Sequence, residues 1–143
     1  VEGIEKDTAM QLEARHMAFV NQLPEHLTVN GNHSLLYSVF RNLTDNAIAY
    51  AGEGSTITLS AEKTSQQVWR FTFSDNGVGV PHEHLARLFE RFYRVDKGRS
   101  RKMGGTGLGL AIVKNAILLH GGSISVKNAL PPNHGLIFTF TLK

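Results

Sequence analysis

The sequence contains no cysteine, no apolar run long enough to cross a membrane and no signal-peptide pattern. Without cysteine the chain forms no disulfide and no thiolate metal site, which fits a reducing cytosol. A membrane-spanning helix needs roughly 20 consecutive apolar residues, so we expect no direct membrane contact by this chain. Because the first residue is Val1 rather than Met, we expect a domain excised from a longer protein.

What is present fits one globular domain. A length of 143 residues supports one core and is short for two, and a 41% hydrophobic content excludes a disordered tail. The net charge of +3 is concentrated in residues 87–102, where basic side chains outnumber acidic ones. Such an excess attracts polyanions. Few aromatic residues interleave with these charges and the remaining surface is not basic, so we expect no nucleic-acid partner.

Apolar periodicity predicts the secondary structure. Helices are expected over residues 5–15, 32–50, 83–89 and from 105 or 106 to 120, the last one ended by Gly121-Gly122. Strands are expected over residues 56–63, 67–75, 123–128 and 136–142, with two short ones within 17–30. The sum predicts an α+β protein, a two-layer α/β sandwich with a mixed, mostly antiparallel sheet and helices on one face.

Two asparagines lie one turn apart on the helix predicted for residues 32–50. Asn42 and Asn46 are spaced by four residues, on the flank of the apolar stripe. Their amide oxygens could hold Mg²⁺, which accepts oxygen ligands and keeps several waters. Alternatively, Asn42 bonds to a neighbouring loop and Asn46 caps or packs.

Asp75 ends a strand on its apolar side. Trp69, Phe71 and Phe73 share one face, and the period of two places Asp75 on the same face. A carboxylate there is costly unless something donates to it. The amino group of an adenine would do so. An Asp-Asn-Gly hairpin turn is the alternative, but the residues after Gly77 make a poor partner strand.

Two glycine clusters flank the basic segment. The first is Asp75-Asn76-Gly77-Val78-Gly79 and the second is Gly104-Gly105-Thr106-Gly107-Leu108-Gly109-Leu110. The second cluster precedes a helix, where unpaired amides and the positive end of the dipole favour an anion. No Lys-Ser or Lys-Thr pair follows it, and a basic loop rather than a strand precedes it, so neither a P-loop nor a dinucleotide fingerprint fits. A flexible hinge is the alternative.

Five motifs, taken in order along the chain, resemble the motifs of one family. Arg41-Asn42-Leu43-Thr44-Asp45-Asn46-Ala47 resembles the N box of sensor histidine kinases. Asp75-x-Gly77-x-Gly79 resembles their first glycine box and residues 88–94 their F box, while residues 105–110 resemble the second glycine box, followed by His120-Gly121-Gly122. From about residue 25 onward the chain therefore resembles the catalytic ATP-binding domain of a bacterial two-component histidine kinase. This superfamily, with its Bergerat-type fold, includes DNA gyrase, heat-shock chaperones and mismatch-repair ATPases.

The resemblance implies a role for each matching residue. Asn46 would ligate Mg²⁺ with Asn42 assisting near the phosphates, Tyr50 would stack beside the adenine, and Asp75 would accept from its amino group. Gly77 and Gly79 would shape the base pocket. Phe89 and Phe92 would anchor a lid of about residues 80–105 to the core, and Arg94 and Arg99 would reach the outer phosphates. The phosphates would be wrapped by Gly105, Thr106, Gly107, Leu108 and Gly109. Asn42, Arg94 and Arg99 are thus the expected catalytic residues.

Two positions depart from the family pattern. A lysine that often touches phosphate is replaced by Ala49, and a threonine common near the base is replaced by Leu136. Lid arginines could compensate for the first change, or nucleotide affinity is low.

The sequence lacks the phosphoacceptor histidine of the family, and this defines the expected reaction. None of the seven histidines is followed by the acidic residue and Arg/Asn-x-Pro pattern of the family's phosphoacceptor. We therefore expect ATP and Mg²⁺ binding here, with the γ-phosphoryl passing to a histidine on a separate dimerisation domain of the same protein. The chain carries no convincing general base, and positioning with charge neutralisation supplies most of the rate of such transfers. A response regulator would be the downstream partner.

Two other functions stay open at this point. One is an ATP hydrolase of the same superfamily, whose members usually carry a glutamate where this chain has Asn42. The other is a degenerate nucleotide-sensing or docking domain, for which Ala49 is the best argument. Residues 1–16 are expected to end a linker helix from an upstream dimerisation region, and residues 17–143 to form the catalytic domain. We expect a cytoplasmic domain whose parent is anchored in the inner membrane.

Overall fold

The computed structural model describes residues 2–24, 27, 31–64, 68–85, 87–90, 109–130 and 133–142. Its helices are α1 (Glu2–Ala14), α2 (His33–Tyr50), α3 (His82–Leu85) and α5 (Gly109–Leu119). Its strands are β1 (Ala18–Asn21), β2 (Thr56–Lys63), β3 (Trp69–Asp75), β4 (Ile124–Asn128) and β5 (Leu136–Leu142). None of the helices within these ranges is both long and apolar enough to span a membrane.

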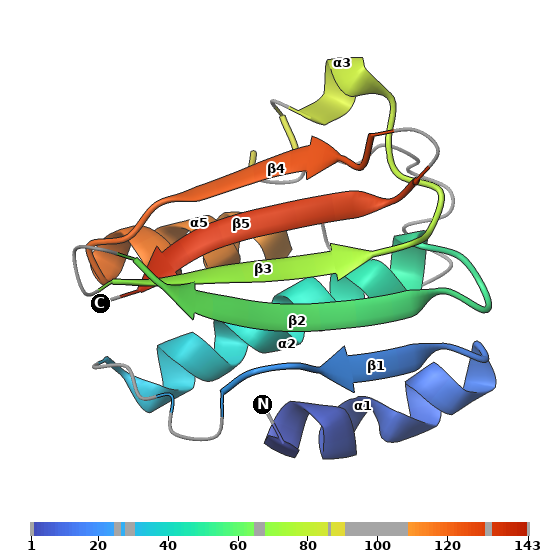
Figure 1. The fold of residues 1–143 in the computed structure, drawn as a ribbon, viewed down its shortest axis with the longest axis horizontal. Helices are drawn as coiled ribbons and strands as arrows, with labels where there is room; N and C mark the ends of the chain where they lie inside the picture. The colour runs from blue at the N-terminus through green and yellow to red at the C-terminus, as the bar shows by residue number, and fades with distance from the viewer. Residues whose placement is uncertain are drawn as a thin grey trace.

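The strands form one mixed sheet in the order β1-β2-β3-β5-β4. β1 runs parallel to β2, and every other neighbouring pair is antiparallel. α2 and α5 lie together behind the sheet, while α1 lies at the β1 edge and α3 at the β4 edge (Figure 1). The predicted α+β sandwich, with a mixed, mostly antiparallel sheet, is confirmed.

The start of α2 and the end of α5 lie at identifiable signals. Asn32 is its N-cap, and the Asn32 Oδ1 accepts a hydrogen bond from the Leu35 N–H at 3.0 Å. Such a cap satisfies one of the amides that a helix start leaves unpaired. α5 is followed by Gly121, whose φ of 73° is the left-handed conformation that commonly terminates helices.

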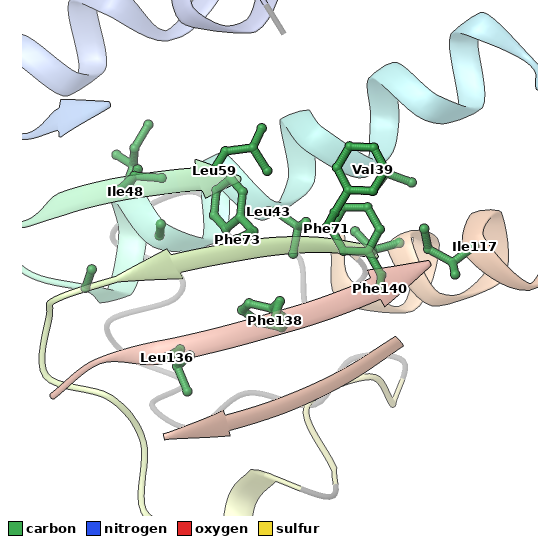
Figure 2. Close-up of a cluster of buried hydrophobic side chains, with 14 of the residues drawn as sticks. Val39, Leu43, Ile48, Leu59, Phe71, Phe73, Ile117, Leu136, Phe138 and Phe140 are labelled. Atoms are coloured by element: carbon green, nitrogen blue, oxygen red, sulfur yellow. The ribbon is translucent and has the colours of Figure 1, made fainter. Parts of the chain in front are cut away.

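The core lies between the sheet and the α2–α5 layer. Residues of β5 alternate strictly between buried and half-buried, because successive side chains of a strand point to opposite faces. The rings of Phe71 and Phe140 stack in parallel with centroids 5.1 Å apart, and the Phe40 ring from α2 meets the Phe71 ring at 64°. Figure 2 shows these strand side chains pointing toward those of the two helices, including Val39, Leu43 and Ile117.

Most of the predicted elements are found, and one differs. Strand β2 has the predicted bounds, whereas the helix predicted over residues 83–89 is a short α3 followed by turns. Hydrogen bonds there join residues three apart, from the Arg87 N–H to the His84 carbonyl and from the Glu90 N–H to the Arg87 carbonyl. Residues 105–108 lie outside the described part of the chain, as does most of the second strand predicted within 17–30.

Candidate functional site

The two asparagines of α2 differ in their contacts. The Asn42 Nδ2 donates to the Ser38 carbonyl at 2.8 Å, one turn earlier on the same helix. Asn46 is half-buried, and its side chain makes no hydrogen bond with the residues that the structure describes. Its amide is therefore available to a ligand. Tyr50 is half-buried at the last turn of the same helix.

Gly109, the first residue of α5, lies against Asn42. A Cβ added at Gly109 would stand 3.1 Å from the Asn42 Oδ1, closer than most real contacts. The end of the second glycine cluster and the first asparagine of α2 are thus brought together across the helix layer. Because the backbone of residue 109 lies so close to the Asn42 amide, only glycine at this position leaves the amide undisturbed.

Asp75 is half-buried at the end of β3, paired with the fully buried Ile57 of β2. Its Oδ1 accepts hydrogen bonds from the Gly77 N–H at 2.9 Å and from the Leu136 N–H at 3.3 Å. Within the described ranges Oδ2 accepts none, so the carboxylate is engaged by its neighbours at one oxygen only.

Burial dominates the electrostatics of this carboxylate. It raises the pKa of Asp75 above the ordinary aspartate value because a charged group is poorly solvated there. The hydrogen bonds from Gly77 and Leu136 and the neighbouring His134 act in the opposite direction on the pKa. A group donating to Oδ2 would further stabilise the charged form.

The first glycine cluster forms a loop packed against the end of α2. A Cβ at Gly77 would overlap the carbonyl oxygen of Ala51, and the Val78 N–H donates to that same carbonyl at 3.0 Å. Gly79 has a φ of 70°, which side chains rarely adopt. No strand follows Gly77 in the described residues 78–85, so the hairpin alternative for Asp-Asn-Gly is wrong; the Gly77 N–H closes a turn on the Asp75 side chain instead.

Sequence reasoning missed two side chains of the hairpin that joins β4 to β5. Asn128 bonds both backbone groups of Val80, and the His134 Nδ1 lies 2.8 Å from the Gly77 carbonyl oxygen. Neither residue belongs to any of the five motifs in the sequence. No local pattern signals these contacts, because they join residues 48 and 57 positions apart.

The remaining expected site residues lie outside the described part of the chain. These are Arg94, Arg99, Gly105, Thr106, Gly107 and Leu108, together with Phe92. Just before them, the Phe89 ring packs edge-on against Phe138 with centroids 6.1 Å apart, as an anchor to the core requires. Among the described residues, no three His, Asp or Glu side chains converge as a metal site.

This arrangement of fold and site matches a known family. Residues 31–143 match the family of histidine kinase-, DNA gyrase B- and HSP90-like ATPases. The matched segment holds both asparagines of α2, Asp75 and both glycine clusters. The chain belongs to this ATPase family, and within it to the catalytic domains of sensor histidine kinases.

Curated relatives support the narrower placement. The chain is 38% identical over 130 residues to the sensor histidine kinase WalK of Bacillus subtilis, covering 90% of this chain and 21% of that protein. It is 42% identical over 119 residues to the sensor-like histidine kinase SenX3 of Mycobacterium bovis, covering 83% of this chain and 28% of that protein. The chain therefore spans about a quarter of the length of these relatives.

Solved structures share the whole fold. The mycobacterial sensor histidine kinase MprB superposes with a TM-score of 0.80 at 29% identity, over 99% of this chain and 93% of that one. The catalytic domain of the histidine kinase ThkA gives a TM-score of 0.82 at 25% identity, over 99% of this chain and 88% of that one. A full-length ShkA structure, determined in complex with AMPPNP, gives 0.80 at 25% identity, over 99% of this chain and 28% of that one.

Proposed function

We propose that this chain binds Mg-ATP and transfers its γ-phosphoryl group to a histidine on a separate dimerisation domain of the same protein. The observation that carries the proposal is the Asp75 carboxylate. Its Oδ1 is held by two backbone N–H groups, and its Oδ2 is left to accept from the adenine amino group. The AMPPNP complex of the similar ShkA structure adds support, because AMPPNP is an ATP analogue.

We assign the phosphate end of the site to the two asparagines of α2 and to the second glycine cluster. Asn46 would hold Mg²⁺ through its unengaged amide oxygen, with Asn42 assisting and with phosphate oxygens and water completing the set. The donor chemistry fits, because a magnesium ion carried by a nucleotide needs few protein ligands. When bound, the metal supplies charge neutralisation. Tyr50 would stack beside the base, and residues 105–109 would surround the phosphates together with Arg94 and Arg99.

Transfer to histidine requires a second domain. The nucleophile would be a neutral imidazole nitrogen, and positioning it in line with the γ-phosphoryl would provide most of the rate. From the phosphohistidine, the phosphoryl group would pass to a response regulator. The names of the relatives WalK and SenX3 support a kinase rather than a hydrolase or a nucleotide sensor.

Nucleotide binding is tested first. Calorimetric titration of the chain with ATP and Mg²⁺ should show one site, and Asp75→Ala should abolish the binding. Thermal unfolding of the variant controls for loss of fold. A wild-type chain that binds no adenine nucleotide would remove the proposal.

The reaction is tested separately. With γ-labelled ATP the chain alone should stay unlabelled, whereas the dimerisation domain of its parent should become labelled when added. Acid-labile label on that domain identifies phosphohistidine. Steady release of phosphate without any acceptor would favour the hydrolase instead.

A further inference from the structure

Residues 77–80 form a loop without strand pairing, and its backbone makes hydrogen bonds on several sides. The Val78 N–H donates to Ala51 at the end of α2, and the Gly77 N–H donates to Asp75. The remaining contacts come from the opposite side, from the hairpin joining β4 to β5. Because a loop without strand pairing depends on such contacts for its position, each one bears on where Asp75 points.

Asn128, the last residue of β4, makes a two-sided contact with the loop. Its Oδ1 accepts from the Val80 N–H at 3.1 Å, and its Nδ2 donates to the Val80 carbonyl at 2.6 Å. One amide thus satisfies both polar groups of one residue, as a neighbouring strand would. A Cβ at Gly79 would stand 2.6 Å from the same Oδ1, so the loop and the amide are in close contact.

His134 holds the other end of the loop. Its Nδ1 lies 2.8 Å from the Gly77 carbonyl oxygen. A carbonyl can only accept, so Nδ1 carries the proton and donates. Gly77 is therefore fixed at both polar groups, its carbonyl by His134 and its N–H by the Asp75 Oδ1. A Cβ at the next residue, Gly135, would overlap Asp75, so the hairpin backbone itself lies against the acid.

We infer that His134 and Asn128 are positioning residues of the adenine site, which act through the Gly77–Val80 loop on the direction of the Asp75 carboxylate. This inference rests on the proposed function. Neither residue needs to touch nucleotide. With His134 removed, Gly77 keeps only the hydrogen bond from its N–H to the Asp75 Oδ1. The loop can then shift and take this contact with it. The Asp75 carboxylate would turn, so that Oδ2 no longer faces the base. Misalignment of about an ångström is enough to weaken such a contact.

The test compares two nucleotides rather than one. Inosine triphosphate carries a carbonyl where adenine carries its amino group, so it cannot donate to Asp75. The ratio of its Kd to the Kd of ATP isolates the contribution of the amino contact. A purely structural role would weaken both nucleotides alike and leave the ratio unchanged.

Four chains are titrated with both nucleotides and Mg²⁺: wild type, His134→Ala, His134→Asn and Asn128→Asp. In His134→Ala the ratio should fall by about three- to tenfold, because a shifted carboxylate keeps only part of its hydrogen bond to the amino group. His134→Asn should restore the wild-type ratio, because the asparagine Nδ2 occupies the place of the imidazole Nδ1 and can donate. In Asn128→Asp the ratio should also fall, since a carboxylate accepts from the Val80 N–H but repels the Val80 carbonyl.

Thermal unfolding of each variant controls for fold, and Asn128→Asp keeps the test valid should the alanine variant be unstable. An unchanged ratio in His134→Ala and Asn128→Asp, with wild type preferring ATP, overturns this inference and leaves the proposed function standing. A wild-type chain that binds neither nucleotide overturns both.

Discussion

Gly109 and Asn42, from two different helices, are in direct contact: a Cβ on the first would stand 3.1 Å from the side-chain oxygen of the second. One residue ends a glycine cluster, and the other begins the pair of asparagines assigned to phosphate and metal. The contact joins the two parts of the proposed phosphate site that lie farthest apart in the sequence. We therefore infer that the space at Gly109 serves the proposed site rather than the helix.

Replacement of Gly109 by alanine tests this requirement. The new methyl group would displace the Asn42 amide by a few tenths of an ångström, and we expect the Kd of Mg-ATP to rise about three- to tenfold. The helix itself should tolerate the change, because alanine is the better helix former by about 1 kcal/mol. Gly3→Ala is the matched control, since nothing lies within 4 Å of a Cβ at Gly3. Equal affinities of both variants for Mg-ATP would contradict the assignment.

Asp75→Asn separates binding from stability. The amide oxygen can still accept from the Gly77 and Leu136 N–H groups, but the half-buried charge is gone. We expect a midpoint of thermal unfolding at neutral pH that equals or exceeds the wild-type value. ATP affinity should fall by roughly ten- to a hundredfold, the value of a hydrogen bond to a charged group. A variant that loses stability but keeps its ATP affinity would show that Asp75 is structural.

The pH dependence follows from the raised pKa of Asp75. Folding raises this pKa, so the folded chain binds the proton more tightly, and the favourable contribution of Asp75 to stability is complete below the unfolded value of about 3.9. It is lost as the pH rises through the higher pKa of the folded state. Urea unfolding should therefore be measured at several pH values from 7 downward. The difference between the free energies of unfolding of Asp75→Asn and wild type should become smaller as the pH falls. A constant difference between the two chains would contradict the raised pKa.

Asn46→Ala tests the metal ligand. Calorimetric titration with ATP should show a loss of affinity of roughly tenfold or more in the presence of Mg²⁺, because charge stabilisation by a bound metal amounts to several kcal/mol. With EDTA the variant and wild type should bind ATP equally. Asn115→Ala, an exposed asparagine on α5, is the control. Equal losses with and without Mg²⁺ would assign Asn46 to packing.

The aromatic core predicts one large stability effect. Phe71→Ala removes a ring that is 1% exposed and stacked on Phe140. We expect a loss of about 3–5 kcal/mol in the free energy of urea unfolding. Thr72→Ala, on the other face of the same strand, should cost about 1 kcal/mol or less. Similar losses for the two variants would contradict the one-sided core.

The sequence predicted those parts of the site that local patterns determine. The bounds of β2, the long helix within residues 32–50 and the position of Asp75 beside the core follow from periodicity between neighbours in the chain. The parallel pairing of β1 with β2 could not be predicted, because strand order depends on contacts between distant segments. The same reason hid the roles of Asn128 and His134. Lengths of short helices depend on weak end effects, and α3 accordingly ends earlier than predicted.

β5 follows β3 and β4 in the sequence, yet it lies between them in the sheet. As the chain emerges from a ribosome, β3 and β4 have no common partner until Leu136 to Leu142 have been synthesised. The Leu136 amide that holds Asp75 arrives in the same step. Pairings of such long range slow folding, since loop closure precedes the contacts that stabilise it. The proposed base site is consequently incomplete until β5 has been synthesised and has paired with β3.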